Sequence, residues 1–150
     1  PPVTLTWWDG GLMPARPAGL ETGRRMGDLD GGILLIGDEG AILAGCYGES
    51  PRIVPESRMR RYRRPGRTLE RIPLGPDGHE QDWVRAIKGG KPASSNFEYS
   101  GPLSETVLMG NLAIRFPDRE LLWNGEAMEV TNVPDANAYV RREYRDGWHL

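Results

Sequence analysis

A chain of 150 residues with a single cysteine and a net charge of −2 already excludes several classes of protein. The length suits one domain and is too short for two ordinary ones, and one cysteine cannot form an internal disulfide framework. The balanced charge creates no global field that would select nucleic acid or an acidic membrane, and no apolar run approaches the roughly 18 residues of a membrane span. The 20 glycines and 13 prolines indicate many turns and long ordered loops rather than a helical bundle.

The first predicted element is a short strand near the start of the chain. Residues 3–8 alternate threonine with apolar side chains, which predicts a half-buried strand, and Asp9 with the two glycines after it ends the strand. Residues 12–31 are rich in glycine and proline and indicate a long ordered loop. Because the chain begins Pro1-Pro2, without methionine or signal peptide, we expect a piece of a longer protein; its location, cytoplasmic or exported, stays open.

The next segments predict a hairpin and then a loop. Two continuous apolar runs, 33–36 and 41–44, flank Gly37-Asp38-Glu39-Gly40, a spacing typical of a β-hairpin whose two faces are both covered. Residues 48–78 hold five prolines and many arginines, and we expect mostly extended loop there.

Two helices are predicted in the second half of the chain. The first lies within residues 77–90, where Asp77 and Glu80 have the spacing of a capping box and Gly89 ends the helix. Its expected buried stripe consists of Trp83, Val84 and Ile87. The second helix spans residues 100–116, with Pro102 in its first turn, and is apolar enough to be buried on most sides.

The chain ends with a predicted hairpin and a predicted third helix. Residues 120–131 predict a hairpin around a two-residue Asn124-Gly125 turn, and a helix is expected from Pro134 to Gly147. The order of hairpins and clustered helices favours an α+β domain with an open, mainly antiparallel β-sheet and helices packed on one face. The other face of the sheet then needs a cover, either a partner domain or a second copy.

An arginine cluster is the strongest charge pattern in the sequence. Residues 57–71 contain seven arginines and one glutamate, a net charge of +6, so with the chain total of −2 the remainder carries −8. Arginines around Tyr62 could bind nucleic acid through phosphate contacts and stacking, but the acidic remainder favours a solvated loop or a protein interface, with an anionic substrate as a further alternative.

The candidate pocket residues lie in loops and at the end of the predicted strand. Aromatic rings beside a carboxylate suit a sugar, because rings stack on sugar faces while the carboxylate accepts from hydroxyls; this points to Trp8 with Asp9, and Trp7 beside them. The alternative for Asp9 is a turn residue that bonds nearby backbone. Further candidates for substrate binding are Arg16, Arg58 and Tyr62.

For the histidines, the cysteine and the remaining carboxylates, the sequence favours structural roles over catalytic or metal-binding ones. His79 and His149 have no partner at metal-ligand spacing, and a surface cap is favoured for His79 over an acid–base role. Cys46 follows an apolar strand as a small buried residue, and Glu105 is expected in a first helical turn. Asp28 and Asp30 resemble a calcium loop only superficially. No catalytic residues and no metal or cofactor site are therefore predicted within this chain.

Four long strings carry a resemblance to a known family. The chain resembles the C-terminal domain of the Gfo/Idh/MocA oxidoreductases, in particular a bacterial branch of dehydrogenases that are often exported, through LTWWDGGLMPARP, GDEGAILAGCYGESPRIVPESRM, GGKPASSNFEYSGPLSETVLMGNLAIR and WNGEAMEVTNVPDANAYVRREYRDGW. The resemblance covers nearly the whole chain. It implies that residues 1–150 form a single C-terminal substrate-binding and oligomerisation domain, with a fold like the C-terminal domains of dihydrodipicolinate reductase and glyceraldehyde-3-phosphate dehydrogenase.

The resemblance also implies a division of labour. In such proteins an N-terminal Rossmann domain binds NAD or NADP and precedes an Asp-x-x-x-His catalytic pair, and neither is found in this sequence. The expected partners are that Rossmann domain, further copies through the open sheet and a small sugar-like or polyol-like substrate, with no membrane. The choice between NAD and NADP stays open. Two alternatives remain: the same fold in an NAD-dependent glycosidase, and a non-enzymatic module that uses the arginine cluster to bind an anion.

Overall fold

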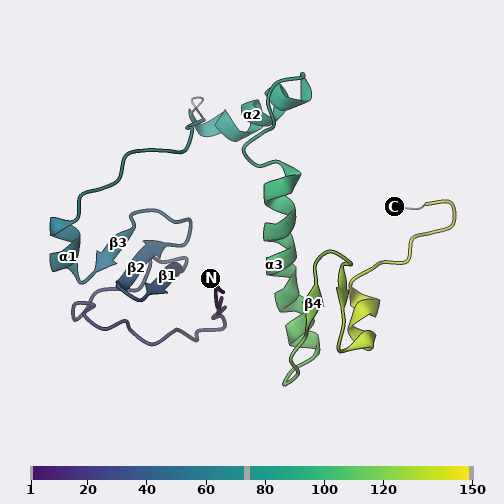
Figure 1. The fold of residues 1–150 in the computed structure, drawn as a ribbon, viewed down its shortest axis with the longest axis horizontal. Coiled ribbons are helices and arrows are strands. Elements are labelled where there is room, and N and C mark those ends of the chain that lie inside the picture. The colour runs from purple at the N-terminus through teal and green to yellow at the C-terminus, as the bar shows by residue number, and fades with distance from the viewer. Residues whose placement is uncertain (1, 73–74, 149–150) are drawn as a thin grey trace. The chain divides into compact units, whose positions relative to one another are not determined.

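A computed structural model describes residues 2–72 and 75–148 of the chain (Figure 1). The fold combines helices with small antiparallel sheets, which confirms the predicted α+β class. The chain forms two compact units, Pro1–Thr68 and Leu69–Leu150. That residues 1–150 act as one C-terminal domain stays a prediction.

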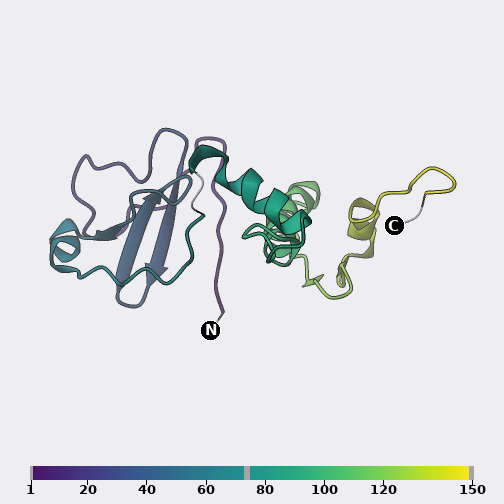
Figure 2. The ribbon, with the colours of Figure 1, turned by 90° about the horizontal axis from the view of Figure 1, so that it is seen from above.

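A three-stranded antiparallel sheet organises the first unit (Figure 2). It contains β1 (Gly32–Gly37), β2 (Gly40–Gly45) and β3 (Arg52–Val54) in the order β1-β2-β3. The first hairpin is thus confirmed, but Gly37 pairs with Gly40, so Asp38 and Glu39 alone make the turn instead of the expected four-residue loop over 37–40. Gly40 has a φ of 147°, which a residue with a side chain rarely adopts, so its glycine is required by the turn.

The predicted covering of both sheet faces is wrong for this unit. Leu43 and Val54 are its buried apolar residues, whereas Leu35 and Ile36 of β1 are 57% and 76% exposed. The apolar character of β1 therefore reflects a surface that nothing within the described unit covers.

Two further predictions for the first unit are corrected. No strand forms at residues 3–8, and Trp7 lies 73% exposed in irregular backbone, because alternation predicts a strand only where a neighbouring strand supplies hydrogen bonds. The predicted loop over 48–78 is interrupted by β3 and by α1 (Glu56–Arg61), which packs against β3. Residues 62–72 are free of helix and strand, as predicted.

The long loop before β1 is held by charged side chains. Arg16 donates to the backbone oxygens of Arg24 and Glu21, at 2.9 and 3.0 Å. Glu21 in turn accepts the backbone N–H of Glu56 at 2.7 Å, and Glu56 accepts from Arg24 at 2.9 Å and from Arg52. The loop is therefore ordered by its attachment to the start of α1.

The second unit consists of helices and a short hairpin around a small core. Its elements are η1 (Gly75–Asp77), α2 (Gly78–Ile87), α3 (Phe97–Arg115), β4 (Trp123–Asn124), β5 (Glu129–Val130) and the 3-10 helix η2 (Pro134–Tyr139). The core is formed by Leu112, Val130, Val133 and Ala136, with Met109, Phe116, Leu121, Trp123 and Val140 packed against it.

Both predicted helices of the second half exist, but their ends and faces differ from the predictions. Asp77 precedes α2 without any side-chain cap bond, so the predicted capping box does not form. The α3 helix begins earlier than predicted because Asn96 caps it, accepting from the backbone of Glu98 and Tyr99. Pro102 consequently lies inside the helix rather than in its first turn.

The predicted burial of these helices is wrong. Trp83 and Ile87 of α2 are 61% and 66% exposed, and Leu112 is the buried residue of α3. Helical periodicity identified an apolar face correctly, but the described unit provides little to pack against it.

The last two predicted elements are confirmed only in part. The second hairpin forms, but Asn124 pairs with Glu129, so the connection is four residues long rather than two. The Asn124 side chain accepts from the backbone N–H groups of Glu126 and Ala127, both at 3.1 Å, and this local bonding opens the turn. The expected helix over 134–147 is reduced to η2, since the backbone after it is irregular.

Candidate functional site

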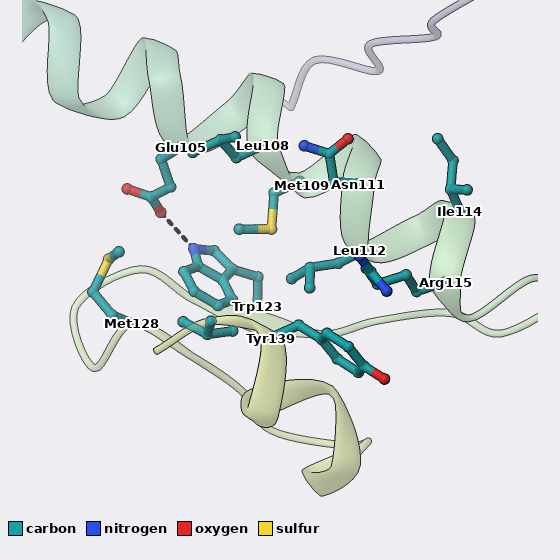
Figure 3. A pocket seen from close by; sticks show the side chains of 11 residues that line it. Glu105, Leu108, Met109, Asn111, Leu112, Ile114, Arg115, Trp123, Met128 and Tyr139 are labelled. Atoms are coloured by element: carbon teal, nitrogen blue, oxygen red, sulfur yellow. Dashed lines mark hydrogen bonds between the residues drawn. The ribbon is translucent and has the colours of Figure 1, made fainter. Parts of the chain in front are cut away.

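A groove of about 560 Å³ lies in the second unit, along the C-terminal half of α3 (Figure 3). The opposite wall comes from the β4–β5 hairpin and η2. Its lining is mainly apolar, with two aromatic rings, two methionines and three polar side chains: Glu105, Leu108, Met109, Asn111, Leu112, Ile114, Arg115, Trp123, Met128, Tyr139 and Val140.

At one end of the groove, a carboxylate fixes a tryptophan ring. The indole Nε1–H of Trp123 donates to Oε1 of Glu105, and both residues are half-buried. Gly125 leaves room for this contact, because a Cβ there would lie 3.0 Å from the same carboxylate oxygen. Figure 3 shows Trp123 beneath α3, between Met109 and Met128. The bond leaves the second carboxylate oxygen of Glu105 without a hydrogen bond to the described residues.

The other end of the groove carries a cation on an aromatic ring. The guanidinium carbon of Arg115 lies 4.6 Å from the ring centre of Tyr139, and Phe116 meets the same ring edge-on at 5.9 Å. Arg115 is ten residues beyond Glu105 on α3, which corresponds to about 15 Å along the helix axis. The exposed amide of Asn111 lies between them in sequence.

The groove offers contacts that can bind and orient a small molecule. Its eleven lining residues include no histidine, cysteine, serine, threonine or lysine, and its ionisable side chains are Glu105, Arg115 and Tyr139. Aromatic rings and a few spaced polar groups in an apolar lining are typical of sites that hold a small molecule in a fixed orientation.

The six predicted pocket residues all lie in the first unit, and no hydrogen bond joins any two of them within the described chain. Asp9 accepts from the N–H of Gly10 at 2.7 Å, and its backbone oxygen accepts from Leu12 at 3.1 Å. Its observed contacts are therefore those of the alternative turn role. Trp7 is 73% and Trp8 48% exposed, in irregular backbone.

Two of the remaining predicted residues, Arg16 and Arg58, hold loops in place. Arg16 donates to two backbone oxygens of its own loop. Arg58 donates to the backbone oxygen of Glu39, and its second guanidinium nitrogen lies 3.5 Å from the Glu39 carboxylate oxygen. Arg58 therefore stabilises the turn of the first hairpin. Tyr62 is half exposed and follows the last residue of α1.

The groove was not predicted from the sequence, although the apolar face of α3 that lines it is visible there. The helix over residues 100–116 was predicted to be buried on most sides, and Met109 and Leu112 of that apolar face do line the groove. The contact of Glu105 with Trp123 joins residues 18 positions apart, and no local pattern predicts such a pairing. Glu105 lies well inside α3, not in its first turn as predicted.

A charged pair on α2, Asp82 and Arg85, has a structural role. Asp82 accepts from Arg85 and from the backbone N–H of Ser94, and these bonds lower its pKa from 3.8 to about 2. Arg85 also donates to the backbone oxygen of Lys91 at 2.8 Å. Together the contacts tie the loop between α2 and α3 to the last turns of α2.

The other reactive groups form no further site in the part of the chain that the structure describes. No three of its histidine, cysteine, aspartate and glutamate side chains are grouped to hold a metal ion. His79 is exposed, Cys46 is half-buried, and His149 lies outside the described residues. None of the described helices is both long and apolar enough to cross a membrane.

The described residues do not fit a dinucleotide cofactor. Dinucleotide phosphates bind where a glycine-rich turn joins a parallel strand to a helix N-terminus. All strand pairs in residues 2–72 and 75–148 are antiparallel, and no such turn precedes α2 or α3. A nicotinamide cofactor would therefore have to be held by residues outside this described part.

Comparison with known proteins leaves the family open. No protein-family model matches the chain, and no curated protein matches it. The resemblance to the Gfo/Idh/MocA oxidoreductases stays a prediction, and the groove is the feature of the described residues from which binding chemistry can be inferred.

Proposed function

We propose that this chain is the substrate-binding and oligomerisation part of an NAD(P)-dependent oxidoreductase of the Gfo/Idh/MocA type that acts on a sugar or polyol. In this proposal the fold is the open-sheet arrangement of the dihydrodipicolinate reductase and glyceraldehyde-3-phosphate dehydrogenase C-terminal domains. The cofactor is held by a Rossmann domain outside the present sequence, and the chain itself supplies substrate contacts and an interface.

The observation that carries the proposal is the large apolar surface left uncovered. The accessible surface is 13306 Å². Two separate folded domains of these lengths would expose only about 9,000 Å² in total. The excess of about 4,000 Å² counts polar and apolar surface together, including that of the irregular residues 2–31 and 62–72, and is on the scale covered in permanent complexes. It includes Leu35 and Ile36 on the sheet and Val107 on α3, as expected of a part that packs on another domain or subunit.

The groove supports the sugar-like substrate. The ring of Trp123 offers an apolar face for sugar C–H groups, whereas one face of the Tyr139 ring already carries Arg115. The free oxygen of Glu105 can accept from hydroxyls, and the Asn111 amide can both donate and accept. Such groups bind and orient a polyol, and the hydride acceptor would be the cofactor held by the other domain.

A pair of glutamates on α3 provides the experiment. Glu105→Gln keeps an oxygen that can accept from Trp123 but removes the charge, whereas Glu98→Gln changes an exposed carboxylate in the first turn of the same helix. In the complete gene product, we expect Glu105→Gln to raise the KM for the sugar about ten-fold at nearly constant kcat, since a charged hydrogen bond contributes about 1.5 kcal/mol or more. Glu98→Gln should leave KM unchanged.

Two results would contradict different parts of the proposal. An unchanged KM in Glu105→Gln, with activity present, would remove the groove from the substrate site. A complete gene product that binds neither NAD nor NADP would overturn the proposed enzyme class.

A further inference from the structure

A separate feature of the first unit is its arginine segment, residues 58–67. It contains six arginines and no acidic residue. Arg58 is paired with Glu39, but the other five are exposed and form no ion pair with any described residue: Arg60, Arg61, Arg63, Arg64 and Arg67. A concentration of like charge without counter-charges destabilises an isolated chain and favours an anionic partner.

The backbone displays these side chains rather than burying them. The α1 helix ends at Arg61, and residues 62–72 contain no helix or strand. Pro65 and Gly66 oppose any continuation of the helix. The planar guanidinium of arginine binds carboxylates through two parallel hydrogen bonds, so an extended row of arginines fits a surface of several carboxylates.

The chain contains a complementary acidic stretch in its second unit, and Arg141 from outside that stretch donates to the backbone oxygen of Ala127 at 3.5 Å. Between residues 118 and 135 there are five acidic residues against Arg119 alone, a net charge of −4, and the five are exposed and without ion pairs among the described residues: Asp118, Glu120, Glu126, Glu129 and Asp135. Glu126 and Glu129 lie on the β4–β5 hairpin and the loop that connects its strands.

We propose that the arginine segment of one copy docks on this acidic stretch, residues 118–135, of a second copy. A two-fold pairing would form the contact twice and neutralise both surfaces. A second copy is favoured over nucleic acid because the chain outside the arginine cluster carries −8, which would repel a polyanion along most of the surface. The inference does not depend on the proposed enzymatic function.

The first test measures self-association of the 150-residue chain by sedimentation velocity at two salt concentrations. We expect the association constant to fall about ten-fold or more between about 0.05 M and 0.5 M salt, because exposed ion pairs are screened over this range. Arg63→Gln with Arg64→Gln should weaken association at low salt, whereas the charge-matched control Arg25→Gln with Arg142→Gln, at exposed arginines outside both surfaces, should not.

A charge exchange provides the decisive test. Chains with Arg63→Glu and Arg64→Glu, and separate chains with Glu126→Lys and Glu129→Lys, should each associate weakly alone, and mixing them should restore salt-sensitive association. Association that is insensitive to salt and to these substitutions would overturn the inference and would show that apolar contacts hold the copies together. A protein that is monomeric at low salt, or that binds a DNA duplex through these arginines instead of a second copy, would overturn it as well.

Discussion

The sharpest prediction about stability concerns Asn137, because its side chain forms hydrogen bonds with both backbone polar groups of the buried residue Val130. Its Oδ1 accepts from the N–H of Val130 at 2.7 Å, and its Nδ2 donates to the Val130 oxygen at 2.9 Å. Val130 is only 2% exposed and belongs to the core of the second unit. Asn137→Ala would therefore leave one buried donor and one buried acceptor without partners.

The expected magnitude follows from these two groups. An unsatisfied buried backbone group costs about 1–3 kcal/mol, so the two together should destabilise the hairpin and η2 by at least about 2 kcal/mol. Each 1.4 kcal/mol is a factor of ten, so local opening should become about thirty-fold more frequent. Amide hydrogen exchange, followed by mass spectrometry of peptides covering residues 118–140, measures this opening directly.

A matched substitution controls for the loss of an amide side chain. Asn111→Ala removes an exposed amide of α3 that forms no hydrogen bond with the described residues. Its effect should lie within about 0.5 kcal/mol, because alanine is the better helix former. Equal exchange rates in Asn137→Ala and the unsubstituted chain, or equal acceleration by Asn111→Ala, would refute the reasoning.

Three further predictions concern the loops and helix ends. The pKa of Asp82 is lowered from 3.8 to about 2 in the folded chain, mainly by the hydrogen bond from Arg85. The carboxylate should therefore stabilise the fold fully above about pH 4, and this stabilisation should be lost as the pH falls toward 2. Exchange of the Ser94 amide should rise over that window, and an equal rise in Asp82→Asn would count against the assignment. Asn96→Ala should destabilise α3 by about 1 kcal/mol and lower the helical circular dichroism, while Asn96→Asp should preserve both; identical spectra for the two would contradict the cap role. Gly27→Ala should open the loop before β1, because Gly27 has a φ of 117° and its added Cβ would lie 2.8 Å from the backbone carbonyl carbon of Gly31 and from the Cα of Gly32; faster exchange of the Gly31 and Cys46 amides checks this, and unchanged exchange would refute it.

Local sequence signals predicted the elements whose stability is local. The first hairpin follows from two apolar runs around a glycine-flanked turn, and its glycines occupy the positions that the turn requires. The α3 helix follows from its periodicity, although the capping Asn96 that sets its start was overlooked. In the second hairpin, the Asn124 side chain accepts from the N–H groups of Glu126 and Ala127, and a four-residue connection forms in place of the expected two-residue turn.

Burial and site geometry could not be predicted in the same way. Periodicity shows which face of a helix or strand is apolar but not what covers it, so Trp83 and Leu35 were expected to be buried and are exposed. The groove depends on the pairing of Glu105 with Trp123 and on the stacking of Arg115 over Tyr139, both between segments distant in sequence. The candidate Asp9 satisfies its own turn, a role that its two following glycines had made an explicit alternative.

The most direct test of the proposed function is the reduction of NAD and NADP by the complete gene product with a panel of sugars and polyols. We predict substrate-dependent reduction of one nicotinamide cofactor, with the 150-residue chain alone inactive because its described residues form no dinucleotide site. No reduction with any sugar or polyol, in a complete protein that does not bind either cofactor, would contradict it.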